Sequence, residues 1–188
     1  MSEISPPFSQ QVRQCALRIR ESGAAALGGL YDLTAVRLVR FAYTITGNQH
    51  DAEDAVSSSL LKVATDVDLI LTATNPWAYL LQIVRNESLL ILRKKSRWSF
   101  AQGLFDFLHT APNNELEQAE SANQVTQALQ KIPKDQAEVV VLKIWEELTF
   151  QEIAAVLNVP TQTAASRYRY AISKLSVLLG TNAIEVPL

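Results

Sequence analysis

Cysteine and histidine are almost missing from this chain of 188 residues, which contains one cysteine and two histidines. Cys15 has no partner for an intrachain disulfide, which fits a reducing cytoplasm. His50 and His109 lie far apart, and neither is accompanied by the spaced ligands of a metal site. The sequence also lacks a glycine-rich phosphate loop and a nucleophile elbow. These absences argue against an enzyme, and they imply neither a cofactor nor a bound metal.

Glycine and proline are also scarce, with six and seven residues, and few of them interrupt the long periodic segments. Because no regular alternation of strands and turns is visible, we predict an all-α fold. No apolar stretch is long enough to span a bilayer, and no basic region followed by an apolar run marks a secretory signal. We therefore expect a cytoplasmic protein of one domain or two small ones.

A surplus of positive charge is absent too, since the formal net charge is −2. This value does not suggest a general nucleic-acid binder, but the distribution of charge is more informative than the sum. Basic residues cluster in two places, which are Arg85, Arg93, Lys94, Lys95 and Arg97, and then Arg167, Arg169 and Lys174. Acidic residues concentrate at Asp51, Glu53 and Asp54, and again at Glu115, Glu117 and Glu120.

A helix-turn-helix pattern stands near the C-terminus, between Leu148 and Ala171. Thr149 and Glu152 have the spacing of a capping box, and flanking apolar residues have that of a hydrophobic staple. Asn158 suits the left-handed conformation that ends a helix, and Pro160 blocks its continuation. We expect Thr161 to cap a second helix.

That second helix has two different faces. The residues expected to pack inward are Ala164, Tyr168, Ala171 and Leu175, at spacings of four, three and four. The residues expected to point outward are Gln162, Ser166, Arg169, Tyr170 and Ser173, with Arg167 on the flank. An outward face of this kind suits a recognition helix in a major groove. From spacing alone, an ordinary helical hairpin with a solvated polar face is an equal alternative.

The chain divides into five segments by composition. We expect a loosely attached extension over residues 1–29, a compact unit over 30–98, a linker over 99–122 with a short helix near 105–108, a second unit over 123–179, and a frayed tail over 180–188. In the first unit, helices should end at Gly47, run from about Gln49 to Val67, and start again at Asn75-Pro76. Although Val139-Val140-Val141 favours a strand by propensity, its helical neighbours predict a helix.

Several short motifs follow one another along the two units in a characteristic order. In the first unit these are Leu30-Tyr31, Thr46-Gly47-Asn48, Asp51-Ala52-Glu53-Asp54-Ala55-Val56, Trp77-Ala78-Tyr79-Leu80 and Ile83-Val84-Arg85-Asn86. In the second they are Ala128-Leu129, Ile132-Pro133, Glu152-Ile153-Ala154, Ser166-Arg167 and Ala171. Their joint order and separation resemble the extracytoplasmic-function (ECF) sigma factors of bacterial RNA polymerase, with sigma region 2 over 30–98 and region 4 over 123–179. The resemblance implies a non-catalytic specificity subunit that binds core RNA polymerase, promoter DNA and an anti-sigma factor, without membrane insertion.

The resemblance also implies site residues. Asp51, Glu53 and Asp54 would bind core polymerase, although acids in the first turn of a helix also stabilise it through the helix dipole. In the minus-ten region, Arg85 and Asn86 would bind unpaired bases. Arg93, Lys94, Lys95 and Arg97 would hold phosphates there. Trp77 is expected in the core, and Tyr79 is ambiguous. The minus-thirty-five region would be contacted by Thr161, Gln162, Ser166, Arg167, Arg169 and Lys174.

This chain departs from the family at four places. Ser57-Ser58-Ser59 replaces a pair such as Gln-Glu, Leu90 replaces a common aspartate, residues 66–71 are acidic and apolar instead of basic, and Ala165 replaces a frequent lysine. These departures lower the positive charge on the expected DNA faces, which predicts weaker or more salt-sensitive promoter binding.

The same departures also motivate an alternative function, a sigma-like interaction module that sequesters an anti-sigma factor. A simple helix-turn-helix regulator would leave the first unit unexplained. We expect two separate modules, whose linker permits compact pairing in isolation and an extended arrangement on polymerase.

Overall fold

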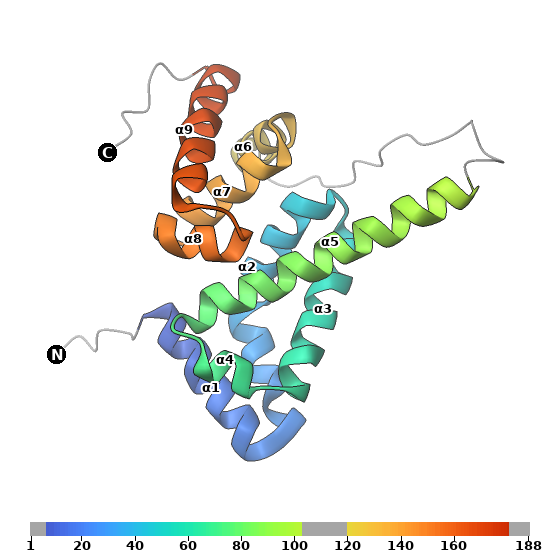
Figure 1. The fold of residues 1–188 in the computed structure, drawn as a ribbon, viewed down its shortest axis with the longest axis vertical. Coiled ribbons are helices and arrows are strands. Elements are labelled where there is room, and N and C mark those ends of the chain that lie inside the picture. The colour runs from blue at the N-terminus through green and yellow to red at the C-terminus, as the bar shows by residue number, and fades with distance from the viewer. Residues whose placement is uncertain (1–6, 103–119, 181–188) are drawn as a thin grey trace.

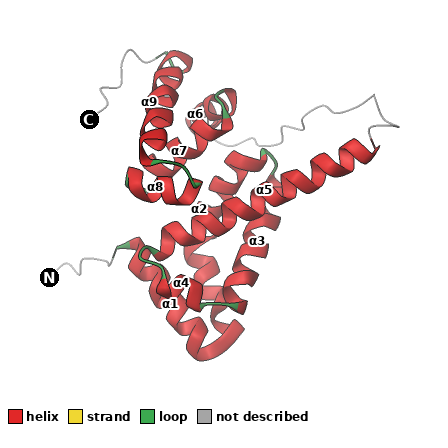
Figure 2. Cartoon of the chain, in the orientation of Figure 1, coloured by secondary structure: helices red, strands yellow, loops and turns green. Residues whose placement is uncertain are grey.

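The computed structural model describes residues 7–102 and 120–180, and every regular element in these two ranges is helical (Figures 1 and 2). The predicted all-α fold is therefore confirmed. Most of the expected linker, its short helix near residues 105–108 and almost all of the expected tail lie outside the described residues. Among the described helices, none is long and apolar enough to cross a membrane.

The first part of the chain is built around three long helices that pack on one another. Its elements are α1 (Phe8–Ser22), a 3-10 helix (Gly23–Ala26), α2 (Leu27–Thr46), α3 (Gln49–Thr65), α4 (Asp68–Thr72) and α5 (Pro76–Gln102). The turn between α2 and α3 follows from local chemistry. Gly47 adopts φ 70°, the left-handed conformation that ends a helix without a steric penalty. The Asn48 side chain then accepts a hydrogen bond from the Asp51 amide at 3.1 Å and caps α3.

Helix α1 is an integral part of this unit, so the expectation of a loosely attached extension is wrong. Val12, Ala16 and Ile19 are almost fully buried, and the helix packs against α2, α4 and α5. Their spacing of four and three residues is an apolar helical stripe. The small residues that follow form the 3-10 helix that leads directly into α2, and this short connection keeps α1 on the bundle.

The second part contains α6 (Glu120–Lys131), α7 (Lys134–Ile144), α8 (Phe150–Leu157) and α9 (Thr161–Leu178). The capping box is confirmed, since the Thr149 side chain accepts from the Glu152 amide and the Glu152 side chain accepts from the Thr149 amide. Asn158 ends α8 at φ 53°, as predicted. The three consecutive valines lie within α7 and are buried, which confirms that tertiary packing overrides their strand propensity.

One predicted cap is wrong. Thr161 is the first residue of α9 instead of its cap, and no side chain in the described part of the chain caps the start of that helix. Pro160 occupies the cap position in an extended conformation, and its carbonyl accepts from the amides of Thr163 and Ala164 at 2.9 and 3.1 Å. The helix therefore starts one residue earlier than predicted, because the backbone of Pro160 supplies the first hydrogen bonds.

The two helical parts of the predicted all-α fold are both present, and they pack on each other through a shared hydrophobic core. Helix α7 packs on α2, and α8 packs on α5 (Figure 1). Leu142 and Ile153 of the second part belong to the same buried cluster as Phe41 and Leu81 of the first. A smaller cluster lies within the second part, between α6, α7 and α9. Compact pairing, which the linker was expected to permit, is the arrangement in this structure.

Candidate nucleic-acid interface

Helix α5 begins at a cap that the sequence predicted. The Asn75 side-chain oxygen accepts from the amides of Trp77 and Ala78 at 3.0 and 3.1 Å, and Pro76 is the first helical residue. Trp77 is 2% exposed, which confirms its assignment to the core. The ring of Phe8 meets it edge to face at 4.8 Å. These contacts fix the start of α5 and therefore the direction of every side chain along it.

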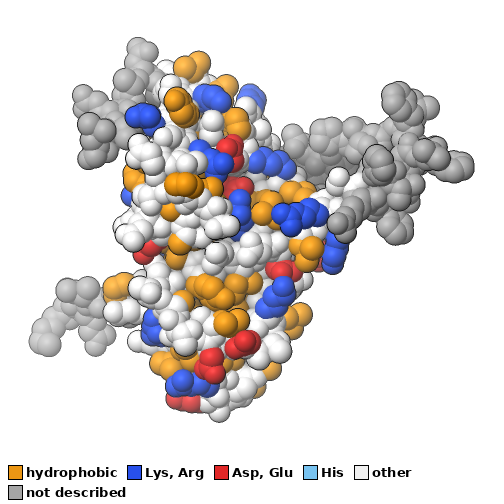
Figure 3. All heavy atoms as spheres, in the orientation of Figure 1, with side chains coloured by type: hydrophobic (Ala, Val, Ile, Leu, Met, Phe, Trp, Pro, Cys, Tyr) orange, Lys and Arg blue, Asp and Glu red, His pale blue; other side chains and the backbone are white. Residues whose placement is uncertain are grey.

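One face of α5 lines a hollow of about 200 Å³. Tyr79, Ile83 and Asn86 of α5 line it at spacings of four and three, and Asp66 and Leu69 line it from outside α5. Lys62 and Glu87, which form an ion pair, and Val63 complete the lining. An apolar patch is visible on this face, between α4 and α5 (Figure 3). The hollow combines an exposed amide, an aromatic ring and apolar walls, which are the groups that bind unpaired bases.

Arg85 points to another side of α5. Its Nε lies 2.6 Å from Oε2 of Glu138 on α7, and the two side chains are 18% and 6% exposed. Burial raises the pKa of the Glu138 carboxyl, although the neighbouring Arg85 guanidinium opposes that change. One turn earlier, Gln82 donates to the Ala155 carbonyl of α8 at 3.2 Å. The structure therefore separates the two residues expected to bind unpaired bases, because Asn86 is exposed and Arg85 is engaged with α7.

The predicted basic cluster at the end of α5 also contains both unengaged, exposed residues and a residue that is paired with an acid. Arg93 and Lys94 are exposed, and the side chain of Arg97 lies outside the described residues. Lys95 Nζ lies 2.7 Å from the carboxylate of Asp51 at the start of α3. In this pair, Lys95 was expected to hold a DNA phosphate and Asp51 was expected to bind core polymerase.

The three acids expected to bind polymerase are not equivalent in the structure. Asp51 is buried and paired with Lys95. Glu53 and Asp54 are exposed, and Glu53 accepts a hydrogen bond from Gln49 at 2.7 Å. The exposed pair is the part of this acidic cluster that is open to a partner.

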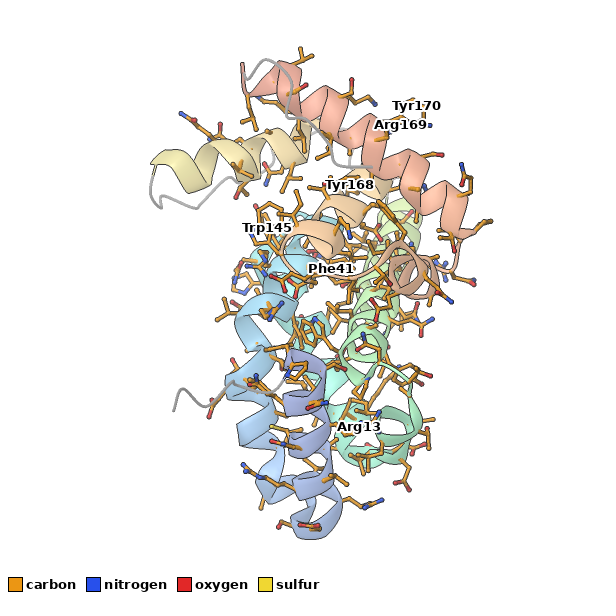
Figure 4. The ribbon with its side chains drawn as sticks, turned by 90° about the vertical axis from the view of Figure 1, so that its left-hand side faces the viewer. Arg13, Phe41, Trp145, Tyr168, Arg169 and Tyr170 are labelled. Atoms are coloured by element: carbon orange, nitrogen blue, oxygen red, sulfur yellow. The ribbon has the colours of Figure 1, made fainter. Side chains whose placement is uncertain are left out.

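Helix α9 presents its predicted outward face to solvent. Arg169 and Tyr170 are exposed, with the guanidinium 5.7 Å from the ring centroid, and both project away from the bundle (Figure 4). Arg167 is partly covered, and its Nε lies 3.1 Å from the Asp135 carboxylate on α7. The other candidate residues on this helix are Thr161, Gln162 and Lys174, which are exposed, and Ser166, which is half-buried and donates to the Gln162 carbonyl at 2.8 Å.

The inward face of α9 is also as predicted. Ala164, Ala171 and Leu175 are buried. Tyr168 is half-buried and meets Phe150 edge to face at 5.6 Å, and burial raises the pKa of its phenol. These contacts hold α9 on α7 and α8 with its polar side outward, which is the arrangement of a recognition helix in a helix-turn-helix.

Two acidic residues of α7 and its C-terminal turn are important in the structure but were not singled out from the sequence. They are Glu138, described above, and Glu146. Glu146 has a fully buried side chain that accepts from Arg37 Nε at 2.8 Å and Arg40 Nη2 at 2.7 Å, both from α2. The available signal was the presence of three acids, Glu138, Glu146 and Glu147, among the mainly apolar residues between positions 137 and 148. Charged residues are almost never buried unless they are paired, so any of these acids that the apolar neighbours bury required a partner elsewhere in the chain.

Comparison with known proteins agrees with this architecture. The family model "Sigma-70 region 2" matches residues 30–97, and "Sigma-70, region 4" matches residues 122–175. The ECF RNA polymerase sigma factor EcfG of Rhodopseudomonas palustris is 31% identical over 160 residues, which cover 81% of this chain and 85% of that protein. The ECF RNA polymerase sigma factor SigW of Bacillus subtilis is 23% identical over 174 residues, covering 85% and 92% of the two chains.

A solved structure shares the fold. The sigma factor RpoE of Bartonella quintana, crystallised with the anti-sigma factor NepR, superimposes with a TM-score of 0.68 at 24% identity, and the match covers 81% of this chain and 96% of that one. The two region matches place the chain among sigma-70-type proteins. Within that class, the chain belongs to the ECF RNA polymerase sigma factor family.

Proposed function

We propose that this chain is an ECF-type sigma factor, a non-catalytic subunit that binds core RNA polymerase and directs it to promoters. In this proposal the hollow beside α5 receives an unpaired base of the minus-ten element, and the outward face of α9 contacts the minus-thirty-five element. The exposed acids Glu53 and Asp54 contribute to core polymerase binding. Their negative charge would complement a basic surface of that enzyme.

The observation that carries the proposal is the position of Asn86. This side chain is exposed, lies on the rim of a hollow with an aromatic wall, and is held on a helix that is capped and packed along its length. An amide can hydrogen-bond the edge of an unpaired base, and Tyr79 offers a ring for stacking. A rigid helix beneath these groups positions them before DNA arrives.

The test is transcription in vitro with purified core polymerase, using promoters selected from a randomised DNA pool by the reconstituted holoenzyme. Asn86→Ala should lower promoter-specific initiation by tenfold or more, because the variant loses base contacts but keeps the helix. Gln14→Ala, an exposed polar-to-alanine change on α1, is the matched control and should leave initiation unchanged. Failure of the wild-type chain to select any promoter sequence would contradict the proposed function.

The second candidate is the sigma-like module that sequesters an anti-sigma factor. It is favoured by the engagement of Arg85 and Lys95 with the chain's own acids, which leaves fewer free cations on the expected DNA faces. This alternative predicts tight binding to an anti-sigma protein together with no initiation at any selected promoter. The transcription assay and a binding assay with such a partner therefore separate the two functions.

A further inference from the structure

We propose that Arg13 of α1 is a positioning residue for the hollow beside α5, because it fixes the main chain of α4, which contributes to the lining of that hollow. The inference rests on the proposed function for its DNA readout. It goes beyond that function because it assigns a role in base selection to α1, which lies outside residues 30–97, the range that the sigma-70 region 2 model matches.

The guanidinium of Arg13 reaches from α1 to the end of α4 (Figure 4). Its Nη1 donates to the Leu71 carbonyl at 2.5 Å, and its Nη2 donates to the Ala73 carbonyl at 2.7 Å. The last carbonyls of a helix have no partner within that helix, so a donor from outside satisfies them. The fixed geometry of one guanidinium also holds the two carbonyls in place relative to each other. Arg13 therefore binds the main chain of α4 instead of one of its side chains.

Apolar packing attaches α4 at few points. The helix has five residues, and Ile70 is the one among them with a buried side chain. Val67 and Leu71 are partly buried against the same core, and Leu69 is 47% exposed. A helix this short has little stability of its own. The hydrogen bonds from Arg13 therefore add a directional attachment that these apolar contacts do not provide.

The packing of α1 holds Arg13 itself in place. Val12 and Ala16, which flank it on the helix, are fully buried. One turn earlier, the Ser9 hydroxyl donates to the side-chain oxygen of Asn75 at 2.7 Å, and Asn75 caps α5. Helix α1 thus connects the end of α4 with the start of α5, and both of these helices contribute residues to the hollow.

The segment between α3 and α5 is consequently attached at both ends. At its start, the Asp66 amide donates to the Lys62 carbonyl at 3.0 Å, where α3 ends. At its end, Arg13 holds the Leu71 carbonyl. Leu69, which lines the hollow, lies between these two attachments. Loss of the second attachment would let Leu69 move relative to α5, and a displacement of about 1 Å is enough to weaken a binding site.

The spacing between α4 and α5 matters for the choice of base. In the proposed function Asn86 hydrogen-bonds the edge of an unpaired base. The Asp66 carboxylate can accept from an exocyclic amino group, and Leu69 offers an apolar wall. A base in the hollow contacts all of these groups only while the spacing is maintained. Arg13 should therefore affect the preference for one base and leave phosphate contacts elsewhere unchanged.

The first experiment measures base preference with holoenzyme reconstituted from the full-length protein and core polymerase. All four bases are placed in turn at each position of the selected minus-ten element, and the position whose preference is lost in Asn86→Ala identifies the base in the hollow. Arg13→Ala should lower the preference at that position by about fivefold or more, which is what one well-placed base contact contributes. Preferences at the other positions and at the minus-thirty-five element should stay within about twofold of the wild type.

Two further variants at exposed or partly exposed arginines of α1 accompany this measurement. Arg18→Ala, the matched control, removes an exposed arginine from the same helix and should change no preference. Arg13→Lys keeps the positive charge and a hydrogen-bond donor but loses the fixed fork of the guanidinium, so its preference should lie between those of the wild type and Arg13→Ala. This variant carries the test if Arg13→Ala does not fold. A wild-type preference in both Arg13 variants would overturn the inference.

The second experiment tests whether Arg13 acts through Leu69. Leu69→Ala shortens a partly exposed side chain, so the variant should fold, and it should lower the preference at the same position. Combined with Arg13→Ala or Arg13→Lys, it should lower the preference by less than the product of the two single losses, because both changes act on one part of the hollow. A loss equal to that product would show that Arg13 acts elsewhere, and it would overturn the inference.

A DNA-free readout separates this inference from the proposed function. Hydrogen exchange in free Arg13→Ala protein should be faster by about fivefold or more at the amides of residues 67–73 and unchanged in α9, with equal helical circular dichroism. Faster exchange in these residues, together with a wild type that selects no promoter, would retain the attachment of α4 by Arg13 and contradict the proposed function. Unchanged exchange, or faster exchange with an unchanged base preference, would overturn the inference.

Discussion

Helices α5 and α9 carry the two sets of residues expected to face DNA, and the rest of the chain covers them to different extents. On α5, Arg85 is held by Glu138, and the same helix supports α8. On α9, the polar face is open, and among the described residues only Arg167 has an acidic partner. Under the proposed function, α5 therefore combines a DNA-facing role with a structural one. A substitution of Arg85 should therefore affect stability and binding together, whereas one on the open face of α9 should affect binding alone.

The largest expected effect tests whether the two parts unfold together. Ile153 belongs to α8, is fully buried, and lies in the cluster that also contains the core of the first part. Ile153→Ala should lower the free energy of unfolding by about 2–5 kcal/mol, because it leaves a cavity in a shared core. Thermal unfolding followed by circular dichroism should show one transition at a lower temperature. Two transitions, with the first part unaffected, would show that the cores are independent.

The next prediction compares the loss of one arginine from each helix. Arg85→Ala leaves the buried Glu138 without its partner, which should cost about 3 kcal/mol of stability in urea unfolding. Arg169→Ala removes an exposed side chain and should change stability by less than about 0.5 kcal/mol. In a salt titration with a minus-thirty-five duplex, Arg169→Ala should reduce the slope by about 1, as expected for one lost phosphate contact. The comparison fails if Arg85→Ala is as neutral for stability as Arg169→Ala.

The helix caps give a smaller contrast. Thr149→Ala removes a capping box at α8 and should destabilise the protein by about 1 kcal/mol. Thr161→Ala changes a residue that makes no capping hydrogen bond, and its effect on stability should be within about 0.5 kcal/mol. Urea unfolding of the two variants measures both values. Equal losses would mean that Thr161 has a capping role that its position in α9 does not provide.

Much of this contrast was predictable from the sequence, and the exceptions have physical causes. Asn48, Asn75 and Thr149 act through residues three positions away or fewer, so local spacing identified the helix starts. The alternation of inward and outward residues on α9 was likewise readable from periodicity. The partners of Arg85 and Glu146 were not, because each pair joins side chains more than fifty positions apart. Only the packing of α7 on α2 and of α8 on α5 brings such charges together.

The candidate site was likewise predictable where a local motif marked a residue, and not where the site depends on long-range packing. Asn86 was singled out by a motif, and the structure places it at a hollow, but its contact with DNA remains a prediction. Leu69 and Asp66, which complete that hollow, lie in a segment that the sequence marked as departing from the family. Their contribution depends on how α4 folds against α5, and composition alone does not specify that. The position of α1 was missed although its apolar stripe was visible, because the small residues after it resembled a loose connection.

The smallest expected effect compares two glutamates that link the parts of the chain. Burial raises the pKa of Glu138, with Arg85 and Arg167 opposing the change and Asp135 adding to it. Burial also disfavours ionisation of Glu152, but hydrogen bonds from Thr149 and Asn75 and the charge of Lys143 outweigh it, so the pKa of Glu152 is lowered. A raised pKa contributes stability below the ordinary value of 4.5, and that stability is lost as pH rises through the raised pKa. A lowered pKa contributes stability above 4.5 that is lost as pH falls through the lowered pKa.

Glu138→Gln and Glu152→Gln should therefore alter the pH dependence of unfolding in opposite directions. The stability of the wild type minus that of Glu138→Gln should fall as pH rises from 4.5. The same difference for Glu152→Gln should rise with pH, mostly below 4.5. Urea unfolding at a series of pH values measures both differences. If both have the same slope, the opposite environments assigned to these carboxyls are wrong. Opposite slopes would show that burial dominates at Glu138 and that hydrogen bonds dominate at Glu152.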